Sequence, residues 1–142
     1  MRLRLLSITG VLALACVLTT GAAHAAGSAY SSAQPLRTEI GGTSCTAPGV
    51  LSSNHGALGV NVAGTNFGVS IALTGATPNS TYNVFVRCHY PPLGQLTTNK
   101  YGEATKHFTR SGAPSYPFDI DLDNVTTPGQ GSFVAGPFTG PK

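Results

Sequence analysis

Three aspartates alternate with large apolar residues near the C-terminus and form the chain's main candidate ligand set. Asp119, Asp121 and Asp123 are spaced two residues apart, which places their carboxylates on one face of a β-strand. Carboxylate oxygens are hard ligands that suit Ca²⁺. Along a strand, however, the three groups would spread over about 13 Å, and the glycine and glutamate of an EF-hand loop do not follow them. We therefore expect a solvated strand face whose charges discourage edge pairing, and no metal site.

The signatures of catalysis elsewhere in the chain are incomplete. Ser70 stands in Gly-Val-Ser-Ile-Ala, which lacks the second glycine of a nucleophile elbow and lies in a β pattern. The three histidines at 55, 89 and 107 lack metal-ligand spacing, and the segment from Gly129 lacks the last glycine of a dinucleotide motif. We therefore expect surface histidines, no cofactor and no enzymatic activity.

The first 25 residues have the order of a secretory signal peptide. A basic start over Met1–Arg4 precedes the uncharged apolar run Leu5–Leu18, and Ala23-His24-Ala25 offers a small-residue cleavage site before Ala26. The apolar run is shorter than the roughly 20 residues that span a bilayer. The sequence thus predicts a secreted protein without a membrane span.

The cysteines favour the same compartment. Cys16 lies in the leader, where Ala13-Leu14-Ala15-Cys16 is similar to a bacterial lipobox. A membrane-anchored lipoprotein is therefore an alternative, although Ala13 replaces the preferred larger aliphatic residue. Removal of the leader leaves Cys45 and Cys88, and an even pair in an exported chain predicts a disulfide. Two free buried thiols are the alternative.

Composition excludes several classes of partner. Charged residues make up 9% of the chain and hydrophobic residues 41%, which is enough apolar material for a core. The formal charge of +3 falls to +1 once Arg2 and Arg4 leave with the leader. A near-neutral chain without a cluster of Lys and Arg predicts no binding of nucleic acid or of an anionic membrane.

The mature chain has the pattern of one all-β domain. Residues 26–35 are small and polar, and we expect a flexible segment there, followed by a single domain over 36–142. Strands are predicted at 36–40, 59–63, 67–73, 82–88, 95–98, 103–110, 118–123 and 133–138, with 43–53 as a loop or edge strand and a hairpin turn at 99–102. A mature chain of 117 residues with one cross-link favours two packed sheets over a barrel.

The segment 67–110 resembles immunoglobulin-like sandwich domains of exported bacterial proteins. The motifs FGVSIALTGATPNSTYNVFV and LGQLTTNKYGEATKHFT carry the resemblance, which covers about a third of the chain and is generic to β-sandwiches. It implies an immunoglobulin-like β-sandwich of seven or eight short antiparallel strands and an exported protein, and it implies no activity. The apoproteins that carry enediyne chromophores look similar in size and hairpin pattern, although they use two disulfides.

One surface segment stands out as a candidate partner-binding loop. It begins beside a predicted disulfide and contains an aromatic residue and two prolines, and rigid aromatics lose little entropy when they dock. The loop consists of His89, Tyr90, Pro91, Pro92 and Leu93. The alternative is a turn whose tyrosine packs back on the core.

The sequence therefore predicts a small exported, non-catalytic binding or cell-surface interaction module. Its partner would be an extracellular protein, a glycan or a small ligand. The alternative is a small-ligand carrier of the enediyne-apoprotein type, which would need a sizeable apolar cavity.

Overall fold

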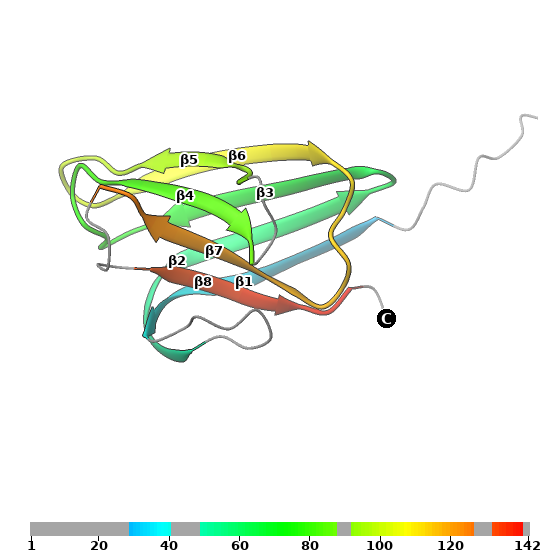
Figure 1. Ribbon diagram of the computed structural model, residues 1–142, viewed down its shortest axis with the longest axis horizontal. Helices are drawn as coiled ribbons and strands as arrows, with labels where there is room; N and C mark the ends of the chain where they lie inside the picture. Colours follow the sequence, from blue (N-terminus) through cyan, green and yellow to red (C-terminus); the bar gives the residue numbers. More distant parts are fainter. Residues whose placement is uncertain (1–28, 41–48, 88–91, 127–131, 141–142) are drawn as a thin grey trace, which may run out of the picture.

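The regular structure of the protein consists of β-strands. The computed structural model describes residues 29–40, 49–87, 92–126 and 132–140, and its strands appear in chain order in Figure 1. They are β1 (Tyr30–Ile40), β2 (Val50–Ala63), β3 (Asn66–Leu73), β4 (Thr81–Val86), β5 (Gly94–Thr97), β6 (Ala104–Ser111), β7 (Phe118–Asn124) and β8 (Phe133–Phe138). Each neighbouring pair is antiparallel. The predicted all-β class and the eight antiparallel strands are confirmed.

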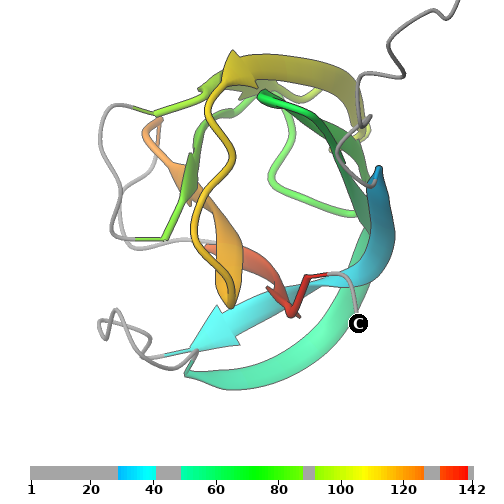
Figure 2. The ribbon, with the colours of Figure 1, turned by 90° about the vertical axis from the view of Figure 1, so that its right-hand side faces the viewer.

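The eight strands form one sheet in the order β5-β4-β7-β8-β1-β2-β3-β6. Figure 2 shows that this sheet curls until its edge strands β5 and β6 approach each other, which gives a nearly closed, barrel-shaped sheet. The expected division into two packed sheets therefore differs from the structure. The long strands β1 and β2 continue the pairing around the curl, and the register of that pair shifts on both sides of Arg37. Such irregularities let a strand bend without leaving its sheet.

The turn predicted at 99–102 forms, but it does not join a hydrogen-bonded hairpin. The Asn99 side-chain oxygen accepts hydrogen bonds from the amides of Tyr101 (2.8 Å) and Glu103 (3.0 Å). β5 then pairs with β4 while β6 pairs with β3, so the turn crosses the opening between the two sheet edges. The Lys106 ammonium bridges this opening by donating to the Gln95 carbonyl at 2.7 Å.

The first strand begins at Tyr30, inside the segment expected to be flexible. Its first residues pair with β2 from Tyr30↔Val62 onward, and the Tyr30 ring packs edge-on against Tyr116 with centroids 5.4 Å apart. Backbone pairing needs no apolar pattern, which explains how a run of small polar residues joins the sheet.

The core fills the space that the sheet encloses. In β3, the alternating residues Phe67, Val69, Ile71 and Leu73 are each 1% exposed, as their period predicted. They meet inward side chains from β4, β7 and β8, and the Phe118 ring lies 5.6 Å from that of Phe67. Within the described residues, no helix is long and apolar enough to cross a membrane.

Candidate functional site

The candidate partner-binding loop is described only at its C-terminal end. Residues 88–91 and Cys45 lie outside the described residues, so the loop and the disulfide stay predictions. Pro92 is exposed, whereas Leu93 is half-buried against the core. The Leu93 amide donates to the Val84 carbonyl at 2.7 Å, which anchors this end of the loop to β4.

The aspartates of β7 do not form the solvated strand face that the sequence led us to expect. Asp119 and Asp121 are only 9% and 7% exposed. The strand lies in the middle of the sheet, between β4 and β8, so these charges do not guard an edge. Asp123 is half-buried and accepts a hydrogen bond from the Ser132 hydroxyl at 3.2 Å. The expectation of a solvated, edge-protecting face is therefore wrong.

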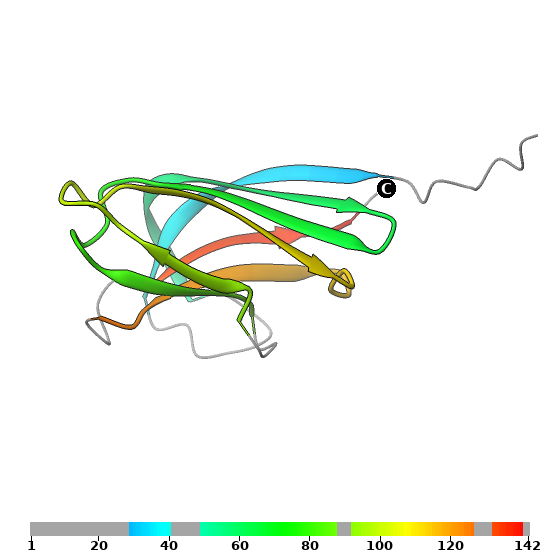
Figure 3. The same ribbon diagram turned by 90° about the horizontal axis from the view of Figure 1, so that it is seen from above.

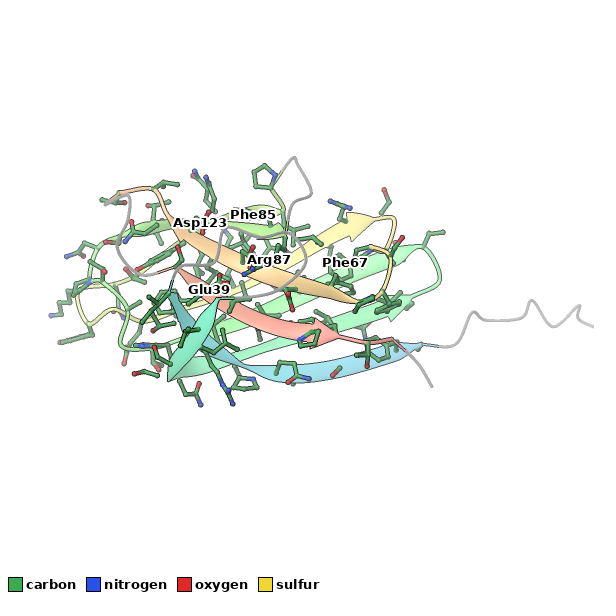
Figure 4. The ribbon with its side chains drawn as sticks, turned by 60° about the horizontal axis from the view of Figure 1, so that its bottom comes forward. Glu39, Phe67, Phe85, Arg87 and Asp123 are labelled. Atoms are coloured by element: carbon green, nitrogen blue, oxygen red, sulfur yellow. The ribbon has the colours of Figure 1, made fainter. Side chains whose placement is uncertain are left out.

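The buried aspartates belong to an ion cluster, which we call the charge cluster and define as Glu39, Arg87, Asp119 and Asp121. Arg87 donates from Nε (3.1 Å) and from a terminal nitrogen (2.9 Å) to Asp121 Oδ1, and from the same terminal nitrogen to Glu39 Oε2. Asp119 Oδ2 lies 3.9 Å from Arg87 Nε. Figure 4 shows Arg87 and Glu39 together on the outside of the sheet, near Phe85. The cluster thus connects β1, the end of β4 and β7.

The guanidinium of Arg87 lies among the carboxylates and is their counter-ion. Within the described residues, no group of three or more His, Cys, Asp or Glu is arranged to hold a metal ion. Asp119 and Asp121 lie beside Arg87, whereas Asp123 accepts a hydrogen bond from Ser132.

Burial changes the acid–base properties of the cluster. It raises the pKa of Asp121 to about 7, against the opposing charge of Arg87, and it also raises the pKa of Asp119. Burial by itself would lower the Arg87 pKa, but the hydrogen bond with Glu39 and the charge of Asp121 raise it above its usual value. Asp119 Oδ1 is buried without a hydrogen-bond partner in the described structure. It lies so close to Gly136 that a Cβ there would be 2.1 Å away.

A second region of the outer surface has the opposite character. The outward positions of β3 and β6, of β1 up to Pro35 and of β2 from Ala57 align in rows across four adjacent strands, which Figure 3 shows side by side. We call this region the uncharged face. It consists of Ser31, Ala33, Pro35, Ala57, Gly59, Asn61, Ala63, Asn66, Gly68, Ser70, Ala72, Thr105, His107, Thr109 and Ser111. Most of these residues are exposed, none is Asp, Glu, Lys or Arg, and none is aromatic except His107.

A serine and a histidine form a polar pair on the uncharged face. Ser70 and His107 are directly opposite on β3 and β6, and Ser70 Oγ lies 2.8 Å from His107 Nδ1. The ring covers Gly68, where a Cβ would come within 3.3 Å of Cε1. Both residues are exposed, whereas an activated nucleophile needs a base that a third group orients. The pair is suited to hydrogen bonding with a docked partner.

The other described histidine is remote from this pair. His55 is half-buried; its Nδ1 lies 3.1 Å from the Thr74 carbonyl oxygen, and its ring lies 5.0 Å from that of Phe133. The structure therefore does not bring His55 and His107 together; His107 is a surface residue, whereas His55 is half-buried. His89 lies outside the described residues.

Large apolar side chains pack inside the described sheet. Tyr82, Phe138 and Leu58 are completely buried inside it. A hollow of about 290 Å³ lies outside the core, at the end of β3 and β6, where Thr74, Asn99 and Glu103 help to line it. It is an open surface depression, unlike the enclosed apolar site that a small-ligand carrier would need.

Comparisons of the chain with protein-family models, with curated proteins and with solved structures found no match. The resemblance to immunoglobulin-like domains therefore rests on the two strand motifs alone. Function has to be argued from the two outer regions of the sheet.

Proposed function

We propose that this protein is a small exported binding module without enzymatic activity, and that the uncharged face is its contact surface. The observation that carries this proposal is the composition of the uncharged face, whose aligned positions on four adjacent strands include no Asp, Glu, Lys or Arg. In β1 this face ends at Pro35, before the exposed Arg37. Solvated surfaces usually carry about 25–35% charged residues, whereas the centres of protein interfaces are depleted in charge.

Desolvating the uncharged face and ordering its side chains both require little free energy. Covering it removes no full charge from water, which is the largest penalty that a docking surface can meet. Its alanine and glycine residues have no rotamer freedom to lose, and serine and threonine have little. The backbone beneath β2 and β3 is already fixed, because each strand is paired on both sides. Little free energy is therefore lost when a partner docks.

The same composition limits the chemistry of the partner. A charged group brought against this face would lose its hydration without gaining an opposite charge. The partner surface is therefore neutral and offers hydrogen-bonding groups, as a protein surface poor in charge or a neutral glycan does. Ser70 and His107 stand within the face, where they can give a docked partner directional hydrogen bonds.

The experiment is a sedimentation assay of purified protein with isolated cell walls of the producing organism. We expect saturable binding by the native protein. The double variant Ser70→Lys with Thr105→Lys should bind at least about tenfold more weakly, because two ammonium groups would be buried without partners. Its Tm should stay within about 3 °C of the native value, since both positions are solvent-exposed.

A matched double variant controls for added charge. Gln95→Lys with Thr97→Lys places the same two charges on exposed positions of β5, outside the uncharged face, and should bind like the native protein. Equal weakening by both double variants would show that total charge, not the face, controls binding. Turnover by the purified protein that a single polar substitution abolishes would contradict the non-catalytic proposal.

A further inference from the structure

We propose that the charge cluster is a proton-retaining clamp. At neutral pH, Glu39, Asp119 and Asp121 keep at least one proton among them, and the connection that they make between β1, β4 and β7 weakens when that proton is lost. This inference concerns the stability of the fold and is independent of the binding role proposed above.

The number of charges in the cluster is the first support. One guanidinium meets three carboxylates through the contacts of Arg87 with Glu39, Asp119 and Asp121. Full ionisation would therefore leave an excess of two negative charges. The four side chains are between 5% and 11% exposed, so water screens this excess poorly. Buried carboxyl groups in such surroundings take up a proton rather than remain charged.

The geometry of Asp119 is the second support. Its Oδ2 lies 3.9 Å from Arg87 Nε, beyond hydrogen-bond distance, whereas Asp121 Oδ1 receives two hydrogen bonds from Arg87. Its Oδ1 has no hydrogen-bond partner in the described structure and lies against Gly136. A carboxylate keeps its charge in the interior only when donors satisfy its oxygens, so Asp119 favours the neutral form.

The groups around the cluster do not supply a second buried cation in the described part of the chain. On β7, Asp123 adds a further half-buried carboxyl group. The neighbouring residues are Ser132, which directly precedes β8, and Val134 on β8, and on β4 the outward neighbour is Phe85. On β1, Arg37 is two residues from Glu39 but is exposed to solvent. The surroundings therefore leave the excess of negative charge in place.

The pKa directions agree with this geometry and set the sign of the pH effect. Burial raises the pKa of Asp121 from 3.8 to about 7 and raises that of Asp119 as well. Between these values the folded protein binds more protons than the unfolded chain, so its free energy of unfolding falls as pH rises. The contribution of the retained proton is complete below about pH 3.8 and is lost as pH rises through about 7.

The experiment is thermal unfolding of the native protein and two variants across pH 5 to 8. We expect the native Tm to fall by at least about 5 °C over this range. Asp119→Asn keeps the shape of the side chain but needs no proton, so its Tm should exceed the native Tm at pH 8 and approach it at pH 5. Glu103→Gln changes an exposed carboxyl group outside the cluster and should follow the native curve.

A titration of the native protein keeps the proposal testable if Asp119→Asn does not fold. Carbon-13 NMR of the side-chain carboxyl groups should show at least one cluster carboxyl group that titrates above about pH 6. Titration of all carboxyl groups below about pH 5 would overturn the proposal. So would an Asp119→Asn variant whose Tm depends on pH as the native Tm does.

Discussion

The uncharged face and the charge cluster, both on the outside of the sheet, differ in how many charged residues they contain and in how deeply those residues are buried. On the uncharged face, most residues meet water, yet the only titratable group of the face is His107. On β7 and at the end of β4, the outward residues include Asp119, Asp121 and Arg87, and these are almost fully buried. Alternation along a strand assigns a residue to a face of the sheet, but it does not determine whether that face is solvated.

The charge cluster and the uncharged face are suited to different roles. Charges in the buried region can persist only through mutual contacts, so their contribution is to join strands. The exposed region lacks such contacts and tolerates desolvation, which makes it the better candidate for recognition. The two roles can be tested separately because Arg87 directly follows β4 and Ser70 lies on β3, and these two strands do not pair with each other.

The largest effect is expected from removing the one cation of the charge cluster. Arg87→Leu would leave the carboxyl groups of Glu39, Asp119 and Asp121 buried without their counter-ion. We expect a loss of about 3–5 kcal/mol in the free energy of unfolding at pH 7.5, measured by urea denaturation. The loss should be smaller at pH 4, because the Asp121 carboxyl group, whose pKa is raised to about 7, is neutral there.

Lys100→Met is the matched control for this variant. It also removes one positive charge, but from an exposed residue of the turn before β6, and should change stability by less than about 0.5 kcal/mol. A loss below about 1 kcal/mol for Arg87→Leu at both pH values would show that the cluster does not hold its strands together.

The next effect concerns the predicted disulfide between Cys45 and Cys88. The Gly49 amide donates to Glu39 Oε1. Glu39, near the end of β1, and Gly49, just before β2, are therefore in contact. Glu39 also binds Arg87, which directly precedes Cys88. Glu39, which precedes the segment that contains Cys45, therefore contacts the residue before Cys88.

A double Cys45→Ser, Cys88→Ser variant should lose about 2–4 kcal/mol of stability, because a covalent link restricts the unfolded chain. The native protein treated with a reductant is the control and should unfold like the variant. Mass spectrometry of the unreduced secreted protein should find it lighter by two hydrogens than the dithiol. Two alkylatable thiols in that sample would contradict the pairing.

The strands could be predicted from the sequence because inward residues keep a strict period. Phe67–Leu73 and Phe118–Leu122 alternate large apolar residues with small or polar ones, and both lie in strands of the structure. The connection of the strands into one sheet could not be predicted. It depends on the bends of β1 and β2, which long-range pairing sets and local residue patterns do not specify.

The charge cluster was missed for a related reason. The aspartates of β7 were recognised, but their partners Glu39 and Arg87 are remote in sequence and become neighbours only through the pairing of β4 with β7 and of β1 with β8. One signal was present: Arg87 ends an otherwise uncharged strand pattern and shares its outward parity with Phe85. A lone charge in that position favours a buried partner, and the aspartates of the predicted strand at 118–123 were available.

The smallest effect is expected for the Ser70–His107 pair, and it measures whether the uncharged face is solvated. A double-mutant cycle with Ser70→Ala and His107→Ala should give a coupling energy below about 0.5 kcal/mol, because water replaces the lost partner of an exposed hydrogen bond. The same cycle on Arg87 and Asp121 should give more than about 1.5 kcal/mol, since their partners stay buried. Both cycles can be measured by urea denaturation at pH 7.5. A Ser70–His107 coupling as large as that of Arg87 and Asp121 would mean that water does not reach the uncharged face in solution. The contrast between the two regions would then be wrong, because the face would already be covered in the unbound protein.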